Sequence, residues 1–147
     1  MKNANDPLIS RRNIKWLILA GGLAISAAIY SAKLYLDRRF QAEVSRLTEI
    51  LQLRPGIAVG EIGAGDGAMT IAIATRAGPN GHVFPTEIDP KLIEKIHRAV
   101  EEHKLNTVTA LPATASDTGL PENCCDAVFM RGVYHHLTDP ADIDRNL

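Results

Sequence analysis

The stretch VGEIGAGDGAMT, residues 59–70, places three glycines at alternate positions directly after a short apolar run. The run IAVGEI (57–62) is typical of a buried strand, and AMTIAIATRAG (68–78) is typical of a helix that stops at glycine and proline. A glycine-rich turn between a strand and a helix lets the backbone approach a bulky ligand closely. The stretch therefore predicts a ligand site where the first strand ends.

The rest of the chain after this turn alternates short apolar runs with helical patterns. The pattern predicts strands at 82–88, 107–111 and 126–132, a helix at 90–104 and a last helix that begins at Asp139. Such alternation is typical of a parallel sheet covered by helices, so we expect an α/β, Rossmann-like, doubly wound and mostly parallel sheet. Pro85 lies inside the second predicted strand, where it removes one hydrogen bond of the ladder.

An uncharged run, WLILAGGLAISAAIYSA (16–32), precedes this domain. A membrane helix needs about 20 apolar residues, and the run reaches residue 36 if Lys33 extends its side chain toward the membrane surface. Residues 1–37 are therefore predicted to form a membrane anchor or signal segment, with residues 16–36 in the lipid bilayer. We expect a single pass with the catalytic domain, residues 38–147, in the cytoplasm, although positive charge on both flanks leaves the orientation undecided.

Two alternatives for this apolar run stay open. The preceding SRRNIK resembles a twin-arginine export signal, with a candidate cleavage site at residues 26–28. An apolar stretch of this kind can also be a buried helix of a soluble protein. After the run, FQAEVSRLTEILQL (40–53) predicts an amphipathic helix that ends at Pro55 and Gly56.

The charge and the cysteines of the chain exclude some classes of function. The formal net charge is −1 and no basic patch is visible, so we expect no nucleic-acid partner. Cys124 and Cys125 are sequence neighbours, and adjacent cysteines make a poor structural disulfide and a poor metal site. They are predicted to be two small, buried or half-buried thiols, and no metal is expected.

The charges around the glycines distinguish between candidate ligands. Gly63, Gly65 and Ala68 fit a relaxed dinucleotide fingerprint. However, Glu61 and Asp66 lie next to the turn, and each carboxylate near a pyrophosphate costs on the order of 1 kcal/mol. S-adenosylmethionine, which carries an ammonium and a sulfonium, is attracted instead. A turn whose acids face water stays open as an alternative.

Three blocks in order resemble the class I S-adenosylmethionine-dependent methyltransferases. VGEIGAGDGAMT resembles their first motif, GHVFPTEIDP their second strand, and GLPENCCDAVFMRGVYHHLTDP their fourth-strand block. The resemblance covers residues 40–147 and implies that S-adenosylmethionine is the cofactor. The family's sheet has seven strands and this chain carries about four, so we expect the domain to be incomplete at its C-terminus and the isolated chain to have little or no activity.

The resemblance also implies roles for individual residues. Glu61 contacts the methionine amino group, directly or through water, and the loop 61–67 lines the methionine and ribose. Glu87 accepts the two ribose hydroxyls, Ile88 packs on adenine, and Asp117 is the expected contact of the adenine amino group. The implied cofactor-binding set is Glu61, Gly63, Ala64, Gly65, Gly67, Glu87, Ile88 and Asp117.

His135, after the fourth predicted strand, is the candidate catalytic base, because a histidine titrates near neutral pH. A histidine that only packs beside the cofactor is the alternative. The predicted function is methyl transfer from S-adenosylmethionine to a small-molecule acceptor. A nucleotide-dependent oxidoreductase and a non-catalytic, membrane-tethered cofactor-binding fragment stay open.

Overall fold

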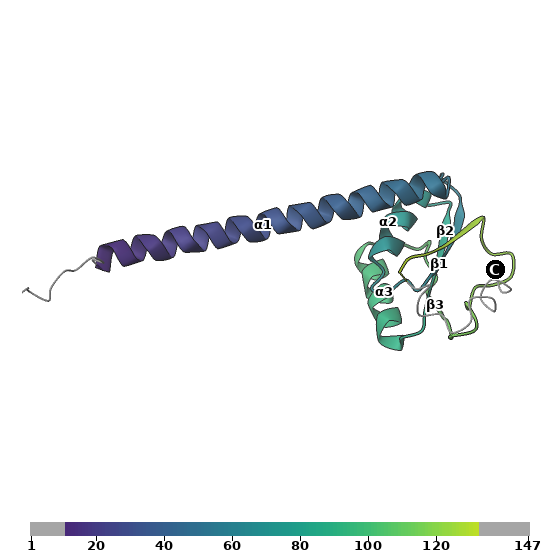
Figure 1. Cartoon of the computed structure of the whole chain (residues 1–147). Coiled ribbons are helices and arrows are strands. Elements are labelled where there is room, and N and C mark those ends of the chain that lie inside the picture. Colours follow the sequence, from purple (N-terminus) through teal and green to yellow (C-terminus); the bar gives the residue numbers. More distant parts are fainter. Residues whose placement is uncertain (1–10, 133–147) are drawn as a thin grey trace, which may run out of the picture. The chain divides into compact units, whose positions relative to one another are not determined.

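The computed structural model describes residues 11–132, and the chain divides into two compact units, Met1–Glu43 and Val44–Leu147. The second is called the α/β unit below. The helices and strands are, in chain order (Figure 1), α1 (Arg11–Ile50), β1 (Ala58–Ile62), α2 (Ala68–Ala77), β2 (His82–Glu87), α3 (Pro90–Glu102), β3 (Leu111–Pro112) and β4 (Ala127–Met130).

Helix α1 is one continuous helix of 40 residues, so the prediction of a separate amphipathic helix starting at residue 40 is wrong. The residues between the apolar and amphipathic patterns are compatible with a helix, so the two patterns merge. The helix ends at Ile50, before Pro55, and the chain turns through Gln52 at a φ of 50°. Val44 faces inward and is fully buried, as the amphipathic pattern predicts.

The N-terminal part of α1 exposes its apolar side chains. Leu23 is 74% exposed and Ile29 is 65% exposed. The helix from Trp16 to Ile50 is long and apolar enough to cross a membrane, with a mean hydropathy of 1.7 over its most apolar window. This is a property of length and composition, which N-terminal signal sequences share.

The strands form one four-stranded sheet in the order β3-β2-β1-β4. All neighbouring pairs are parallel, which confirms the predicted α/β, Rossmann-like sheet. The chain order reverses between β1, which pairs with β2 on one side, and β4 on the other. In open sheets of this type, ligands bind at the carboxyl ends of the strands beside such a reversal.

Pro85 explains why the third strand differs from its prediction. Alternate residues of β2 face β3: Val83 donates to Thr107 and accepts from Thr109, and Glu87 accepts from Ala113. Pro85 lies between them on the same side and has no N–H to donate. The strand predicted at 107–111 is therefore reduced to an isolated bridge between Val83 and Val108 and the two-residue strand β3.

Helices α2 and α3 lie on one face of the sheet (Figure 1). Val59 of β1, Ile73 of α2 and Ile96 of α3 are each fully buried there. Gly60 faces the opposite side of β1, since side chains alternate along a strand. On that side, a Cβ at Gly60 would lie 3.0 Å from Leu120 Cδ1 and 3.3 Å from Cys125 Sγ.

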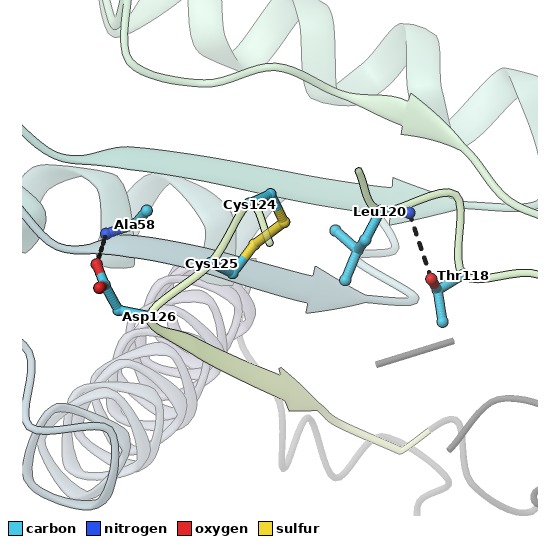
Figure 2. The surroundings of a disulfide bond; sticks show 6 residues. All are labelled: Ala58, Thr118, Leu120, Cys124, Cys125 and Asp126. Atoms are coloured by element: carbon cyan, nitrogen blue, oxygen red, sulfur yellow. Dashed lines mark hydrogen bonds between the residues drawn. A yellow bond between two sulfur atoms is a disulfide. The ribbon is translucent and has the colours of Figure 1, made fainter. Parts of the chain in front are cut away.

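The two adjacent cysteines form a disulfide, Cys124–Cys125, with Cα atoms 3.7 Å apart. The prediction of two thiols is therefore wrong. The pair lies in the loop 113–126 that joins β3 to β4 (Figure 2), where both residues are half-buried. The folded loop brings the sulfurs together over Gly60, a contact that the spacing of neighbouring residues alone does not reveal.

Candidate cofactor site

The glycine loop begins where β1 ends and is tied to the end of β2. Gly63, Gly65 and Gly67 all have positive φ, at 70°, 62° and 82°, a region that side chains rarely adopt. The amides of Gly63 and Ala64 both donate to the carbonyl of Thr86, at 2.9 and 3.0 Å. The three alternate glycines thus provide the positive φ angles that the loop needs, and the two bonds to Thr86 hold the loop against the end of β2.

The surroundings of the loop glycines differ. A Cβ at Gly65 would meet no atom within 4 Å, so open space lies beside this residue. A Cβ at Gly67 would lie 3.1 Å from Ile96 Cγ1, so this glycine allows α2 and α3 to pack closely. The open side of the loop is therefore at Gly65, where a ligand has room.

Glu87, the last residue of β2, directs its carboxylate into the loop. Its Oε2 accepts the amide of Gly65 at 2.9 Å, and its Oε1 accepts the amide of Ile88 at 2.8 Å. The side chain is 8% exposed. The structure thus brings together the acid and the glycine that the sequence analysis assigned to the same ligand.

Glu61 is buried beneath the loop, at 2% exposure. Burial raises the pKa of its carboxyl to about 7, against the lowering effects of the hydrogen bond from Thr70 and the charge of Arg131. Thr70 Oγ1 donates to Glu61 Oε2 at 2.5 Å. Sequence reasoning missed Thr70 and Arg131. Thr70 was visible as a hydroxyl in the first turn of the predicted helix, whereas Arg131 reaches the site only through the pairing of β4 with β1.

The remaining predicted residues lie around the same end of the sheet. Ile88 directly follows β2 and is 65% exposed. Asp66 is exposed and its Oδ1 accepts the amide of Ala68 at 3.2 Å. Asp117 lies in the loop 113–126, where its Oδ1 accepts the amide of Gly119 at 2.9 Å. His135 and the helix predicted from Asp139 lie outside the described residues.

Residues 59–146 match the family model of a methyltransferase domain. The chain belongs to the class I S-adenosylmethionine-dependent methyltransferases. Its cofactor is S-adenosylmethionine. The resemblance that the three sequence blocks suggested is thereby confirmed.

Several curated methyltransferases are similar to this chain. A protein-L-isoaspartate O-methyltransferase of Methanothrix thermoacetophila is 34% identical over 68 residues, which are 46% of this chain and 32% of that protein. Nocamycin O-methyltransferase of Saccharothrix syringae is 28% identical over 89 residues, 60% of this chain and 32% of that protein. The chain thus spans about a third of the length of each of these two relatives.

A solved structure shows the same fold. The crystal structure of a SAM-dependent methyltransferase from Aquifex aeolicus aligns with a TM-score of 0.65 and 21% identity, covering 70% of this chain and 55% of that one. At this identity the match supports the fold, and it agrees with the parallel sheet described above.

Proposed function

We propose that the chain is the cofactor-binding part of a methyltransferase that acts on a small molecule, with S-adenosylmethionine held at the loop 61–67. One observation carries the proposal: the carboxylate of Glu87 lies 2.9 Å from the amide of Gly65. A ribose acid and a glycine loop with open space therefore meet at the carboxyl ends of two adjacent strands, beside the reversal of strand order.

The hydrogen-bonding capacity of Glu87 fits a ribose. A carboxylate has about four acceptor positions. The amide of Gly65 uses one on Oε2, and the amides of Ile88, at 2.8 Å, and Asp89, at 3.3 Å, both donate to Oε1. The remaining position, on Oε2, suits one ribose hydroxyl, and the second hydroxyl is proposed to replace the long bond from the amide of Asp89. Exposed Ile88, directly after Glu87, offers an apolar surface for adenine, and Asp117 remains the proposed contact of the adenine amino group.

The electrostatics fit a cationic ligand. Burial raises the pKa of Glu61 to about 7, so near neutral pH both its protonated and its ionised forms are populated. An ammonium group nearby favours the carboxylate and lowers that pKa. Binding of the cofactor's amino group thus stabilises a charge that burial alone opposes, which supports Glu61 as the contact of the methionine end.

Methyl transfer requires mainly that donor and acceptor be positioned in line. S-adenosylmethionine supplies the activated methyl group, and the residues of this chain bind and orient it. Gly65 leaves room, Glu87 holds the ribose, and Glu61 with Thr70 holds the methionine end. His135 is proposed as the base that accepts the proton of the nucleophile.

A small-molecule acceptor is the proposal favoured here, and nocamycin O-methyltransferase is the relative that supports it. The protein-L-isoaspartate methyltransferases favour a second candidate, the carboxylate of an isoaspartyl residue in a protein. Long incubation with labelled S-adenosylmethionine of high specific activity, which detects even the little activity expected of this chain, compares transfer to a panel of small acceptors with transfer to an isoaspartyl peptide. Labelling of the peptide alone would overturn the small-molecule proposal.

We also propose that residues 16–36 hold the chain in a bilayer, uncleaved, with the α/β unit in the cytoplasm. The exposed apolar side chains of α1 support the span, and the supply of S-adenosylmethionine in the cytosol supports the side. Membranes washed with carbonate should retain the full-length chain. A soluble product that starts near residue 29 would establish export instead.

Titration calorimetry with S-adenosylmethionine and its demethylated product tests the cofactor site. The Gly65→Val variant should lose binding, because its side chain fills the space of the ligand. Gly78→Val is the matched control: Gly78 also has a positive φ, of 72°, and open space around its Cβ position, but it lies at the far end of α2. If both variants lost cofactor binding equally, backbone strain would explain the loss, and the proposed site would be contradicted.

A further inference from the structure

The Cys124–Cys125 disulfide lies over the sheet rather than at the edge of the molecule. Together with Leu120 it occupies the place where a side chain of Gly60 would be, at 3.3 Å for Cys125 Sγ and 3.0 Å for Leu120 Cδ1. Figure 2 shows the disulfide and Leu120 side by side over the strands. The bridge is therefore part of the packing that holds the loop 113–126 against β1.

The residues on either side of the disulfide are fixed by hydrogen bonds. Asp126 pairs twice with Ala58: its amide donates to the carbonyl at 2.9 Å, and its Oδ2 accepts the amide at 2.8 Å. Upstream, the amide of Cys124 donates to Pro121 at 3.3 Å. Figure 2 draws the bond between the Ala58 amide and the side chain of Asp126. Two short bonds thus hold Asp126 to β1, whereas one longer bond holds the loop upstream, so a change at the two sulfurs is transmitted mainly into the loop.

The upstream part of this loop carries Asp117. Its Oδ1 accepts from Gly119, its carbonyl accepts from Thr114, and buried Thr118 accepts the amide of Leu120 at 3.3 Å. Leu120 is in turn the residue that shares the surface of Gly60 with Cys125. A short run of contacts therefore connects the disulfide to the residue proposed to contact adenine.

Both cysteines are half-buried, so neither residue is enclosed in the core. The α/β unit is proposed to lie in the cytoplasm, which is reducing. Disulfides in that compartment are usually transient, and they are catalytic or redox-sensing. In this chain the bridge closes only a two-residue segment, so it constrains the loop locally and leaves the strands connected by their own hydrogen bonds. Opening it does not require the α/β unit to unfold.

We propose that Cys124 and Cys125 form a reversible thiol–disulfide exchange site for low-molecular-weight thiols, and that its redox state sets the order of the loop 113–126. The thiolate of an external thiol attacks one sulfur, and the other cysteine leaves as a thiolate that takes up a proton. A second external thiol then displaces the first cysteine. Two external thiols are oxidised to one disulfide, and the protein gains two cysteine thiols.

The full-length protein in detergent micelles tests the proposal with dithiothreitol as the thiol. Air-equilibrated protein should resist alkylation by N-ethylmaleimide, and reduction should add two adducts, which mass spectrometry counts. Amide hydrogen exchange in the loop 113–126 should then accelerate about fivefold or more, with exchange in α2 unchanged. Equal exchange before and after reduction, or two alkylated thiols before it, would overturn the proposal.

A Cys124→Ser, Cys125→Ser double variant is the matched control. Its loop should exchange at the rate of the reduced protein and should not respond to dithiothreitol. A response in the double variant would show that the reductant acts elsewhere, which also overturns the assignment. The comparison of oxidised and reduced unsubstituted protein stands by itself if the double variant folds poorly.

Discussion

Helices α1 and α2 are both rich in apolar residues, yet they expose them very differently. In α2, Met69 is 1% exposed and Ile73 is fully buried. In α1, Leu23 is 74% exposed and Ile25 is 63% exposed. Composition alone does not separate these helices. The covering elements do: α2 is covered by the sheet and α3, whereas the apolar part of α1 is left uncovered by the described residues.

The strongest way to break this comparison is to place charge in the apolar part of α1. The double variant Leu23→Arg, Ile25→Arg should disfavour membrane insertion by about 6 kcal/mol, since each arginine at the centre of a span costs roughly 3 kcal/mol. Carbonate extraction should find it in the soluble fraction, whereas a control with valine at both positions stays in the membrane. Unchanged retention would show that α1 is not held by lipid.

The corresponding change in α2 should affect folding and not location. Ile73→Ala removes a fully buried side chain and should lower the free energy of unfolding by roughly 2–5 kcal/mol. Urea denaturation followed by circular dichroism measures the loss, with Ile29→Ala in α1 as the control. Equal destabilisation by the two substitutions would contradict the distinction between the helices.

A second difference between the two helices' surroundings is that the α/β unit buries an ionisable side chain, Glu61. Its pKa is raised from 4.5 to about 7, so the folded state holds the proton more tightly than the unfolded state. This contribution is fully present below pH 4.5 and is lost as the pH rises to about 7, by about 3 kcal/mol in all. Unfolding measured between pH 5 and 8 should show the decline.

The Glu61→Gln variant isolates that contribution, because it cannot ionise. The difference in unfolding free energy between the original protein and this variant should change with pH in the stated direction. A pH-independent difference would mean that Glu61 titrates normally. The cofactor should also reduce the dependence, since its ammonium group lowers the pKa of Glu61.

The smallest expected effect concerns Glu87, whose carboxylate holds the glycine loop even without a ligand. Glu87→Ala should weaken cofactor binding by about 1.5–3 kcal/mol, the range for hydrogen bonds to a charged group. Calorimetry measures it, and Asp89→Ala, which removes the cap of α3 nearby, is the control. A loss below about 0.5 kcal/mol would mean that the ribose lies elsewhere.

Sequence reasoning succeeded where the deciding interactions are local. The strand, glycine turn and helix from Ala58 to Ala77, and the next strand and helix to Glu102, match their predicted positions within about two residues. Proline at the start of α3 and glycine at the end of α2 marked those boundaries in the sequence. The glycine-rich turn between the first strand and helix likewise predicted the end of the sheet at which the candidate cofactor site lies.

It failed where a distant segment decides the outcome. The third strand depends on what Pro85 can donate to it, and the disulfide depends on how the loop 113–126 folds over Gly60. Arg131 affects Glu61 only because β4 pairs with β1. For His135 the proposed role stays a prediction, because that residue lies outside the described part of the chain.

The missing N–H of Pro85 has a consequence for the order in which the sheet opens. Between the bridge at Val108 and the short strand β3, the pairing of this segment with β2 lacks one backbone hydrogen bond. By contrast, β1 and β2 pair along five consecutive positions. Local opening of a native protein starts where the backbone hydrogen bonding is weakest. We therefore expect the sheet to open first at its β3 edge, with the segment 107–113 separating from β2 while β1, β2 and the glycine loop remain paired.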